Sequence, residues 1–224
     1  MRDFKLLIFD WDGTLADSVN QIVQTMQSAI EALQLPPRND QQIGELIGLG
    51  FADGLRRLYP DFDPQSLMQL IFEYRRQAPF SAYTAPLFDG AAATLRMLST
   101  AGYHLAVATG KSREGLDRSL QGHQGIAPLF ATTRCADETA DKPDPLMLAQ
   151  ILDELGLDAA EALMIGDTDY DVSMAQAIGM ASLGVATGAH DPGRLLQAGA
   201  RAVVEDVRAI PAWLGLPASP RRFA

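Results

Sequence analysis

The stretch Lys5-Leu-Leu-Ile-Phe-Asp-Trp-Asp-Gly-Thr-Leu15 decides the fold. Leu6 to Phe9 form an apolar run that is bounded by a charge on one side and by a polar turn on the other. A run this short is typical of a strand whose two faces are both buried in a parallel sheet. Gly13 then permits a tight turn that a residue with a Cβ atom resists. The stretch therefore predicts a central strand that ends in a polar turn.

Two carboxylates, Asp10 and Asp12, leave this strand one residue apart. Residues i and i+2 of an extended chain lie on one face, and ligand sites of open α/β sheets lie at the carboxyl ends of strands. Two neighbouring anions repel each other, and a divalent cation with hard oxygen ligands, Mg²⁺ above all, relieves that repulsion. The alternative is that Asp-x-Asp-Gly is only a polar turn, and the partners found further along the chain argue against it.

The segment 16–82 is predicted to be entirely helical. Apolar residues recur at helical spacing from residue 18 until Pro36-Pro37, and shorter helices are expected at 41–47, 51–58 and 65–77. No part of this segment has the pattern of a strand. We therefore predict a helical cap domain at 16–82, inserted into a core domain made of 1–15 and 83–224.

Strands and helices alternate from Asp89 onward. Strands are predicted at 103–109, 130–135, 162–166, 181–186 and 202–204, with helices between them. Such alternation predicts an α/β fold with a doubly wound parallel sheet and right-handed crossovers.

Further polar residues stand at the ends of these strands or just before helices. They are Thr109, Gly110 and Lys111 after one strand, Lys142 before a helix, and Asp167 and Asp171 after another strand. Parallel strands bring their carboxyl ends to one edge of the sheet, so these groups are expected to converge on Asp10 and Asp12.

The predicted set has the chemistry of phosphoryl transfer. Asp10 is placed to attack a phosphoryl group and form an acyl-phosphate, while Mg²⁺ and Lys142 neutralise charge. Asp12 is placed to act as general acid and base. Thr109 can hydrogen-bond a phosphate oxygen with the backbone N–H groups of Gly110 and Lys111 assisting. Asp167 completes the metal site and Asp171 can hold metal-bound water. The Lys111 side chain is expected to be exposed to solvent.

The motifs Asp10-Trp-Asp-Gly-Thr-Leu15, Thr109, Lys142-Pro143 and Gly166-Asp-Thr-Asp-Tyr-Asp171 resemble those of the haloacid dehalogenase superfamily, in its order and approximate spacing. The chain looks most like the phosphoglycolate phosphatases of that superfamily, with an alpha-helical cap after the first motif. The resemblance implies that Asp10 is the nucleophile and Asp12 the acid/base. It also implies that Mg²⁺ is held by the Asp10 side chain, the Asp12 backbone carbonyl and Asp167. Thr109 and Lys142 would bind the phosphoryl group, although Gly-Lys follows Thr109 where Asn is common.

The amino-acid composition argues against some classes of binding partner. The 224-residue chain has a formal net charge of −10 and no basic run, which argues against nucleic acids and anionic membranes. Its single cysteine, Cys135, and the lack of a long apolar run fit a cytoplasmic protein. The expected partner is a small phosphorylated metabolite, and the oligomeric state stays open.

Two other functions stay open. One is a sugar phosphomutase of the same superfamily, whose cap usually supplies a histidine that residues 16–82 lack. The other is a non-catalytic binding protein on the same fold. Specificity is expected to come from the cap near 48–57, where Arg56 or Arg57 can meet an anion or can simply be solvated.

Overall fold

A computed structural model describes residues 4–77 and 85–216 of the chain. Six strands form one sheet in the order β3-β2-β1-β4-β5-β6, and every neighbouring pair is parallel. The strands are β1 (Leu6–Phe9), β2 (His104–Thr109), β3 (Phe130–Cys135), β4 (Ala162–Gly166), β5 (Ala181–Val185) and β6 (Val203–Val204). The doubly wound α/β sheet predicted from the sequence is confirmed.

The first strand lies in the middle of the sheet, between β2 and β4. Phe9 is paired with Val107 on β2 and with Ile165 on β4, so the carboxyl ends of these three strands lie within two residues of one another. The residue that follows Phe9 is Asp10, and its backbone N–H donates to the carbonyl of Ile165 at 2.9 Å. The register therefore carries the polar groups of three chain segments to one edge.

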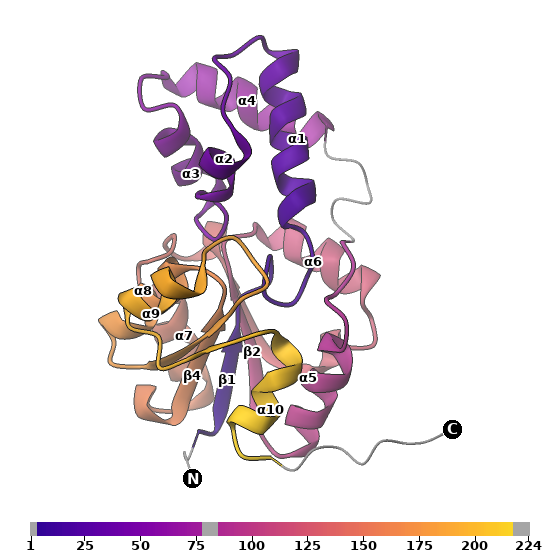
Figure 1. The fold of residues 1–224 in the computed structure, drawn as a ribbon, viewed down its shortest axis with the longest axis vertical. Helices are drawn as coiled ribbons and strands as arrows, with labels where there is room; N and C mark the ends of the chain where they lie inside the picture. The colour runs from indigo at the N-terminus through magenta and orange to yellow at the C-terminus, as the bar shows by residue number, and fades with distance from the viewer. Residues whose placement is uncertain (1–3, 78–84, 217–224) are drawn as a thin grey trace.

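Helices cover both faces of the sheet (Figure 1). One face packs against α5 (Ala91–Thr100), α6 (Arg113–Gly122) and α10 (Ile210–Trp213). The other packs against α7 (Leu146–Leu155) and α8 (Asp169–Ala177), with α9 (Pro192–Ala198) beside α8. Short 3₁₀ helices lie at Ala127–Leu129, Ala136–Glu138, Ala159–Glu161 and Val207–Ala209.

Strand β1 shows why helices must cover both faces of the sheet. Leu7 and Phe9 belong to the apolar cluster on the α5 side, whereas Leu6 and Ile8 belong to the cluster on the α7 side. All four side chains are fully buried. Successive side chains of a strand point to opposite faces, so an unbroken apolar run requires a layer of helices on each.

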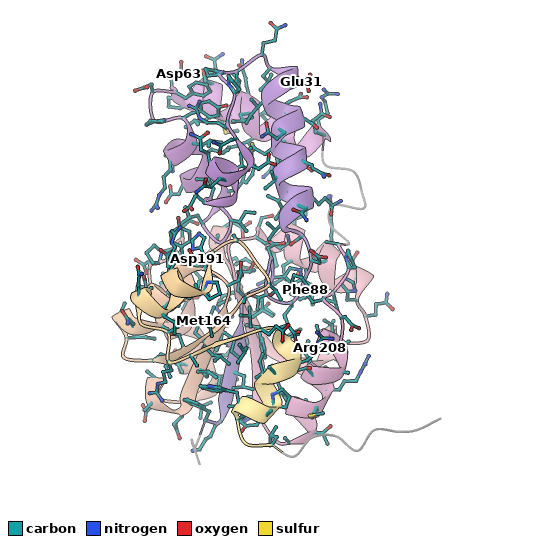
Figure 2. The ribbon with its side chains drawn as sticks, viewed as in Figure 1. Glu31, Asp63, Phe88, Met164, Asp191 and Arg208 are labelled. Atoms are coloured by element: carbon teal, nitrogen blue, oxygen red, sulfur yellow. The ribbon has the colours of Figure 1, made fainter. Side chains whose placement is uncertain are left out.

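Four helices form a separate group above the polar edge of the sheet (Figure 1). We call α1 (Val19–Ala32), α2 (Asp40–Gly44), α3 (Phe51–Leu58) and α4 (Pro64–Gln77) the four-helix group. They pack around a hydrophobic cluster of their own. Glu31 and Asp63 lie at the end of this group that is remote from the sheet, whereas Asp191 lies near the junction (Figure 2). These helices fall within the segment 16–82 that was predicted to be a cap, and its predicted boundary at 82/83 lies outside the described residues.

The segments that enter and leave the four-helix group lie side by side. Asp17 N–H donates to the carbonyl of Pro86 at 2.8 Å, and Phe88 N–H donates to that of Leu15 at 2.9 Å. An antiparallel bridge joins Ala16 to the same returning segment. The two connections to the sheet are therefore held together at one place. Along the described residues, no helix is long and apolar enough to cross a membrane.

Candidate active site

Asp10 follows the central strand and is buried at the polar edge of the sheet. Its side chain is 1% exposed, and Oδ1 lies 2.8 Å from Nζ of Lys142. Neither carboxylate oxygen has a partner in hydrogen-bonding geometry among the described residues. Burial raises the pKa of Asp10 well above its ordinary value; Lys142 opposes this shift, and Asp171 and Asp167 add to it. A buried carboxylate whose one close cationic neighbour among the described residues is Lys142 suits either a metal ligand or a nucleophile.

Asp167 and Asp171 lie beside Asp10. One oxygen of each of the three carboxylates falls within 4.8 Å of the others, and all three residues are buried. Asp167 is fixed by the Thr14 hydroxyl, which donates to Oδ1 at 2.8 Å, and by the backbone N–H of Ala189, which donates to Oδ2 at 2.8 Å. Burial, and then the charge of Asp171, raise the pKa of Asp167 to about 7.

Glycine allows the Asp167 carboxylate to approach the turn after β1. Gly13 adopts a φ of 78°, and a Cβ atom there would lie 2.4 Å from Oδ2 of Asp167. The conformation and the close approach both exclude other residues. Gly13 thus brings two distant motifs into contact.

The ammonium group of Lys142 bridges two of these carboxylates. Its Nζ lies 2.8 Å from Asp10 and 2.6 Å from Asp171, and its side chain is fully buried. Burial acts to lower the pKa of Lys142, but the charges of Asp10 and Asp171 outweigh it, so that the pKa is raised. Asp171 also accepts from the Thr168 hydroxyl at 2.6 Å and from the Thr168 backbone N–H at 3.2 Å, and the second of these bonds belongs to the N-terminal capping box of α8.

Asp12 has different partners. The Ser18 hydroxyl donates to its Oδ1 at 2.6 Å, and Lys111 Nζ donates to both carboxylate oxygens at 2.7 and 2.8 Å. The expectation that Lys111 is solvent-exposed is wrong, because its side chain is only 15% exposed. The two carboxylates of the first motif therefore each have their own lysine, Lys142 for Asp10 and Lys111 for Asp12.

Thr109 is the last residue of β2, and Gly110 follows it. Thr109 is fully buried, and its hydroxyl accepts from the Lys111 N–H at 3.2 Å. A Cβ atom at Gly110 would lie 2.5 Å from the carbonyl oxygen of Leu49 in the four-helix group. The absence of a side chain at Gly110 therefore lets the backbone of the four-helix group approach this strand end.

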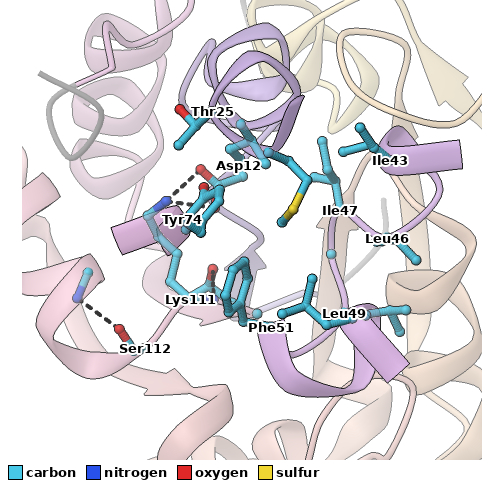
Figure 3. A pocket seen from close by; sticks show the side chains of 18 of the residues that line it. Asp12, Thr25, Ile43, Leu46, Ile47, Leu49, Phe51, Tyr74, Lys111 and Ser112 are labelled. Atoms are coloured by element: carbon cyan, nitrogen blue, oxygen red, sulfur yellow. Dashed lines mark hydrogen bonds and ion pairs between the residues drawn. The ribbon is translucent and has the colours of Figure 1, made fainter. Parts of the chain in front are cut away.

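A cavity of about 180 Å³ lies between the four-helix group and the strand ends (Figure 3). Asp10, Asp12, Thr109, Gly110 and Lys111 form its floor, whereas Lys142, Asp167 and Asp171 are not among the residues that line it. All seven predicted site residues thus lie at one edge of the sheet, in two adjoining sets.

Arg56 and Arg57 do not line the cavity. Arg56 is exposed and pairs with Asp53 at 2.5 Å, and Arg57 is exposed and lies 5.7 Å from the ring of Tyr170. The helical period of α3 gives the reason, because Leu55 and Leu58 face inward and leave both arginines on the outer face. That period is present in the sequence and favours the solvated alternative.

A polar contact ties the four-helix group to the core, and it was not predicted. Glu45 forms an ion pair with Arg194, whose Nε also lies 2.8 Å from Asp169. The Tyr170 hydroxyl donates to the Glu45 carbonyl at 2.8 Å. His190 is buried in the same cluster, and burial followed by the charge of Arg194 lowers its pKa. The sequence has no signal for this pairing, because Glu45 and Arg194 are 149 positions apart.

Two known proteins are similar to this chain over nearly its whole length. A phosphoglycolate phosphatase of Rhodospirillum rubrum is 32% identical over 224 aligned residues, which cover 95% of this chain and 92% of that protein. The probable phosphatase IndB of Dickeya dadantii is 33% identical, with 96% of this chain and 97% of that protein covered.

Solved structures share the fold. A hydrolase from Pseudomonas syringae superposes with a TM-score of 0.86 at 25% identity and covers 96% of this chain and 100% of its own. A predicted phosphoglycolate phosphatase from Haemophilus somnus gives a TM-score of 0.85 at 23% identity, covering 96% of this chain and 99% of its own.

The model of the haloacid dehalogenase-like hydrolase family matches residues 7–185, so the family predicted from the motifs is confirmed. This match spans most of the sheet and the whole polar edge. It shows that the chain belongs to the haloacid dehalogenase-like hydrolases.

Proposed function

We propose that this hydrolase is a Mg²⁺-dependent phosphatase that cleaves a small phosphorylated metabolite through an aspartyl-phosphate on Asp10. The observation that carries the proposal is the pairing of the Asp10 carboxylate with Lys142 at 2.8 Å, directly below a cavity whose floor also holds Asp12. The relatives named as phosphatases support the same reaction class.

The three buried carboxylates fit a divalent cation. Their oxygens lie within 4.8 Å of one another, and both oxygens of Asp10 have no hydrogen-bond partner among the described residues. We assign Asp10, Asp167 and the backbone carbonyl of Asp12 as ligands of Mg²⁺, with Asp171 beside them to hold metal-bound water. When bound, Mg²⁺ would neutralise the charge of the carboxylates and of the phosphoryl oxygens.

Asp10 attacks the phosphorus atom of the substrate and forms a carboxyl O–P bond while the P–O bond to the leaving alcohol breaks. Lys142 lies beside the attacking carboxylate, where its charge reduces repulsion between Asp10 and the incoming phosphoryl dianion. Thr109 and the backbone N–H of Gly110, on the cavity floor, are assigned to the phosphoryl oxygens. Burial of these groups keeps the charge interactions strong.

Asp12 supplies the proton transfers. It lies on the cavity floor beside Asp10, so it can protonate the leaving alcohol in the first step. In the second step, the same carboxylate takes a proton from the water that attacks the phosphorus atom. The bond between phosphorus and the Asp10 carboxyl oxygen then breaks, which frees Asp10 and releases inorganic phosphate. The Ser18 hydroxyl and Lys111 orient the Asp12 carboxylate between these steps.

The four-helix group acts as a cap in this proposal. It contributes most of the cavity wall and is joined to the sheet by two connections that lie side by side. Rotation about that place would admit substrate, and closure would exclude bulk water from the site.

Release of inorganic phosphate from p-nitrophenyl phosphate, with Mg²⁺ and with EDTA, tests the proposal. We expect turnover that EDTA removes and added Mg²⁺ restores. No turnover of any phosphomonoester would favour a binding protein, and transfer of phosphate between sugar positions without release would favour a mutase. 2-Phosphoglycolate and a small sugar phosphate are the metabolites to assay alongside.

A further inference from the structure

The wall of the cavity above Asp10 and Asp12 is mainly hydrocarbon. Every helix of the four-helix group adds an apolar side chain to it, and so does the loop before α3. These side chains are Ile22 and Met26 from α1, Ile43 from α2, Ile47 from the loop, Phe51 from α3 and Tyr74 from α4. Phe51, Tyr74 and Ile47 surround the space beside Asp12 and Lys111 (Figure 3).

Besides the carboxylates and Thr109 of the floor and the Tyr74 hydroxyl, the polar side chains that line the cavity are Gln21, Thr25, Arg75, Lys111 and Ser112. The Thr25 hydroxyl donates to the Gln21 carbonyl of its own helix at 2.8 Å. Lys111 gives both carboxylate oxygens of Asp12 a hydrogen bond. Arg75 touches the cavity from an exposed position on α4. Among the described lining residues, Lys111 is therefore the one cation that is largely buried, and it already has an anionic partner.

These walls favour an apolar leaving group over a charged one. A carboxylate placed against these walls would lose water, with Lys111 already paired to Asp12 and Arg75 at an exposed position, and sugar hydroxyls would lose water with few side-chain partners beyond Gln21 and Ser112. A hydrocarbon body instead gains the free energy of leaving water. An apolar cavity of about 150 Å³ holds one benzene molecule, so the 180 Å³ here suits a body of similar size.

We infer that the substrate is a phosphate monoester of an alcohol with an apolar body, roughly the size of a benzene ring, that occupies the space enclosed by Phe51, Ile47 and Tyr74. This inference rests on the proposed phosphatase function, and it names the class of leaving group for that site. Phosphoglycolate, with a carboxylate next to the reacting ester, is then a poor substrate.

A homologous series of alkyl phosphates tests the inference on the wild-type enzyme. The leaving alcohols from ethyl to hexyl differ little in acidity, so changes in kcat/KM report the cavity rather than the chemistry. We expect kcat/KM to rise about threefold to fourfold for each methylene until the cavity is full, since burying one CH₂ gains about 0.8 kcal/mol and 1.36 kcal/mol is tenfold in rate. Propyl phosphate, which has one non-hydrogen atom fewer than 2-phosphoglycolate, should be the better substrate of the two.

Two matched variants test whether the dependence of kcat/KM on alkyl chain length arises in this cavity. Phe51→Ala removes a ring that lines the cavity, and we expect it to lower kcat/KM for butyl or benzyl phosphate by about tenfold or more while ethyl phosphate changes little. Phe72→Ala makes the same change on α4 at a side chain that is 63% exposed and does not line the cavity. It should leave the whole series as in the wild type. Phe51→Leu gives the same comparison if the alanine variant does not fold.

The outcomes separate this inference from the proposed function. Turnover that is independent of chain length, or a 2-phosphoglycolate rate about tenfold above that of propyl phosphate, would overturn the inference and leave the phosphatase intact. Equal effects of Phe51→Ala and Phe72→Ala would also overturn it. Absence of metal-dependent turnover with every ester, p-nitrophenyl phosphate included, would reject the proposed function itself.

Discussion

The Nζ atom of Lys142 lies 2.8 Å from Oδ1 of Asp10, and both side chains are almost completely buried. The same ammonium group also lies 2.6 Å from Asp171. One positive charge therefore faces two of three clustered carboxylates, and a net negative charge remains for a divalent cation to balance.

Replacing Lys142 should lower both rate and stability. Lys142→Ala is expected to lose roughly 10²–10³ in kcat, the scale for removing one preorganised charge, and about 3–5 kcal/mol of stability, because two buried anions lose their partner. Steady-state kinetics and thermal unfolding measure the two effects. Lys5→Ala, at an exposed ion pair with Glu161, is the control and should change neither by much. A near-wild-type rate for Lys142→Ala would show that the lysine does not act on the phosphoryl group.

Replacing Asp12 should lower kcat/KM more for substrates with poor leaving groups than for substrates with good ones. Asp12→Asn is expected to lose roughly 10²–10⁴ in kcat/KM with an alkyl phosphate, whose alkoxide needs a proton to depart. The loss should be much smaller with p-nitrophenyl phosphate, because p-nitrophenolate departs without one. Measuring both substrates on the same preparation controls for folding. Equal losses would rule out Asp12 as the acid of the first step.

The sheet could be predicted from the sequence because the residues of β1 are all apolar, which is typical of a central parallel strand. The run Leu6–Phe9 requires two helical layers, and parallel pairing of β1 with β2 and β4 then gathers the strand-end motifs at one edge. Family membership followed from the same motifs and is confirmed. The roles of the site residues and the cap boundary stay predictions.

Contacts between side chains that are far apart in the sequence could not be predicted from the sequence. Nothing near Lys111 indicates that it reaches Asp12, and a lysine after a strand is solvated in most proteins. The contact of Glu45 with Arg194 likewise depends on how the four-helix group lies on the core. Such contacts follow from the packing of whole elements, which local periodicity does not specify.

Stability should depend on pH through Asp167. Its pKa of about 7 in the folded protein exceeds the unfolded value near 4, so between these pH values the folded state binds a proton that the unfolded chain has released. This contribution to stability is present at low pH and is lost as pH rises towards about 7 in the metal-free protein. Mg²⁺ binds the ionised form of Asp167. The rise in Tm that Mg²⁺ produces should therefore be larger at about pH 8 than at about pH 5.5. Asp167→Asn should remove most of this difference between the two pH values. A difference as large as that of the wild type would place the cation elsewhere.

The contact between Glu45 and Arg194 should favour the closed cap. Glu45→Ala is expected to raise KM by up to about fivefold with little change in kcat, because part-exposed ion pairs contribute at most about 1 kcal/mol and the open state would become more populated. Glu73→Ala removes a carboxylate that pairs with Arg76 within α4, and it is the matched control. Identical kinetics for the two variants would mean that the Glu45 contact does not bias closure.

The central claim is that Asp10 carries the phosphoryl group during turnover. Enzyme that is acid-quenched while hydrolysing substrate, then digested and analysed by mass spectrometry, tests it most directly. The account predicts that the peptide containing Asp10 gains the mass of one phosphoryl group, and that borohydride reduction converts Asp10 to homoserine only in the phosphorylated sample. Asp10→Asn should show neither change and no turnover, with a Tm at or above that of the wild type, since a buried carboxylate with a strongly raised pKa has been removed. Phosphate on another residue, or turnover by Asp10→Asn within about tenfold of the wild type, would contradict the account.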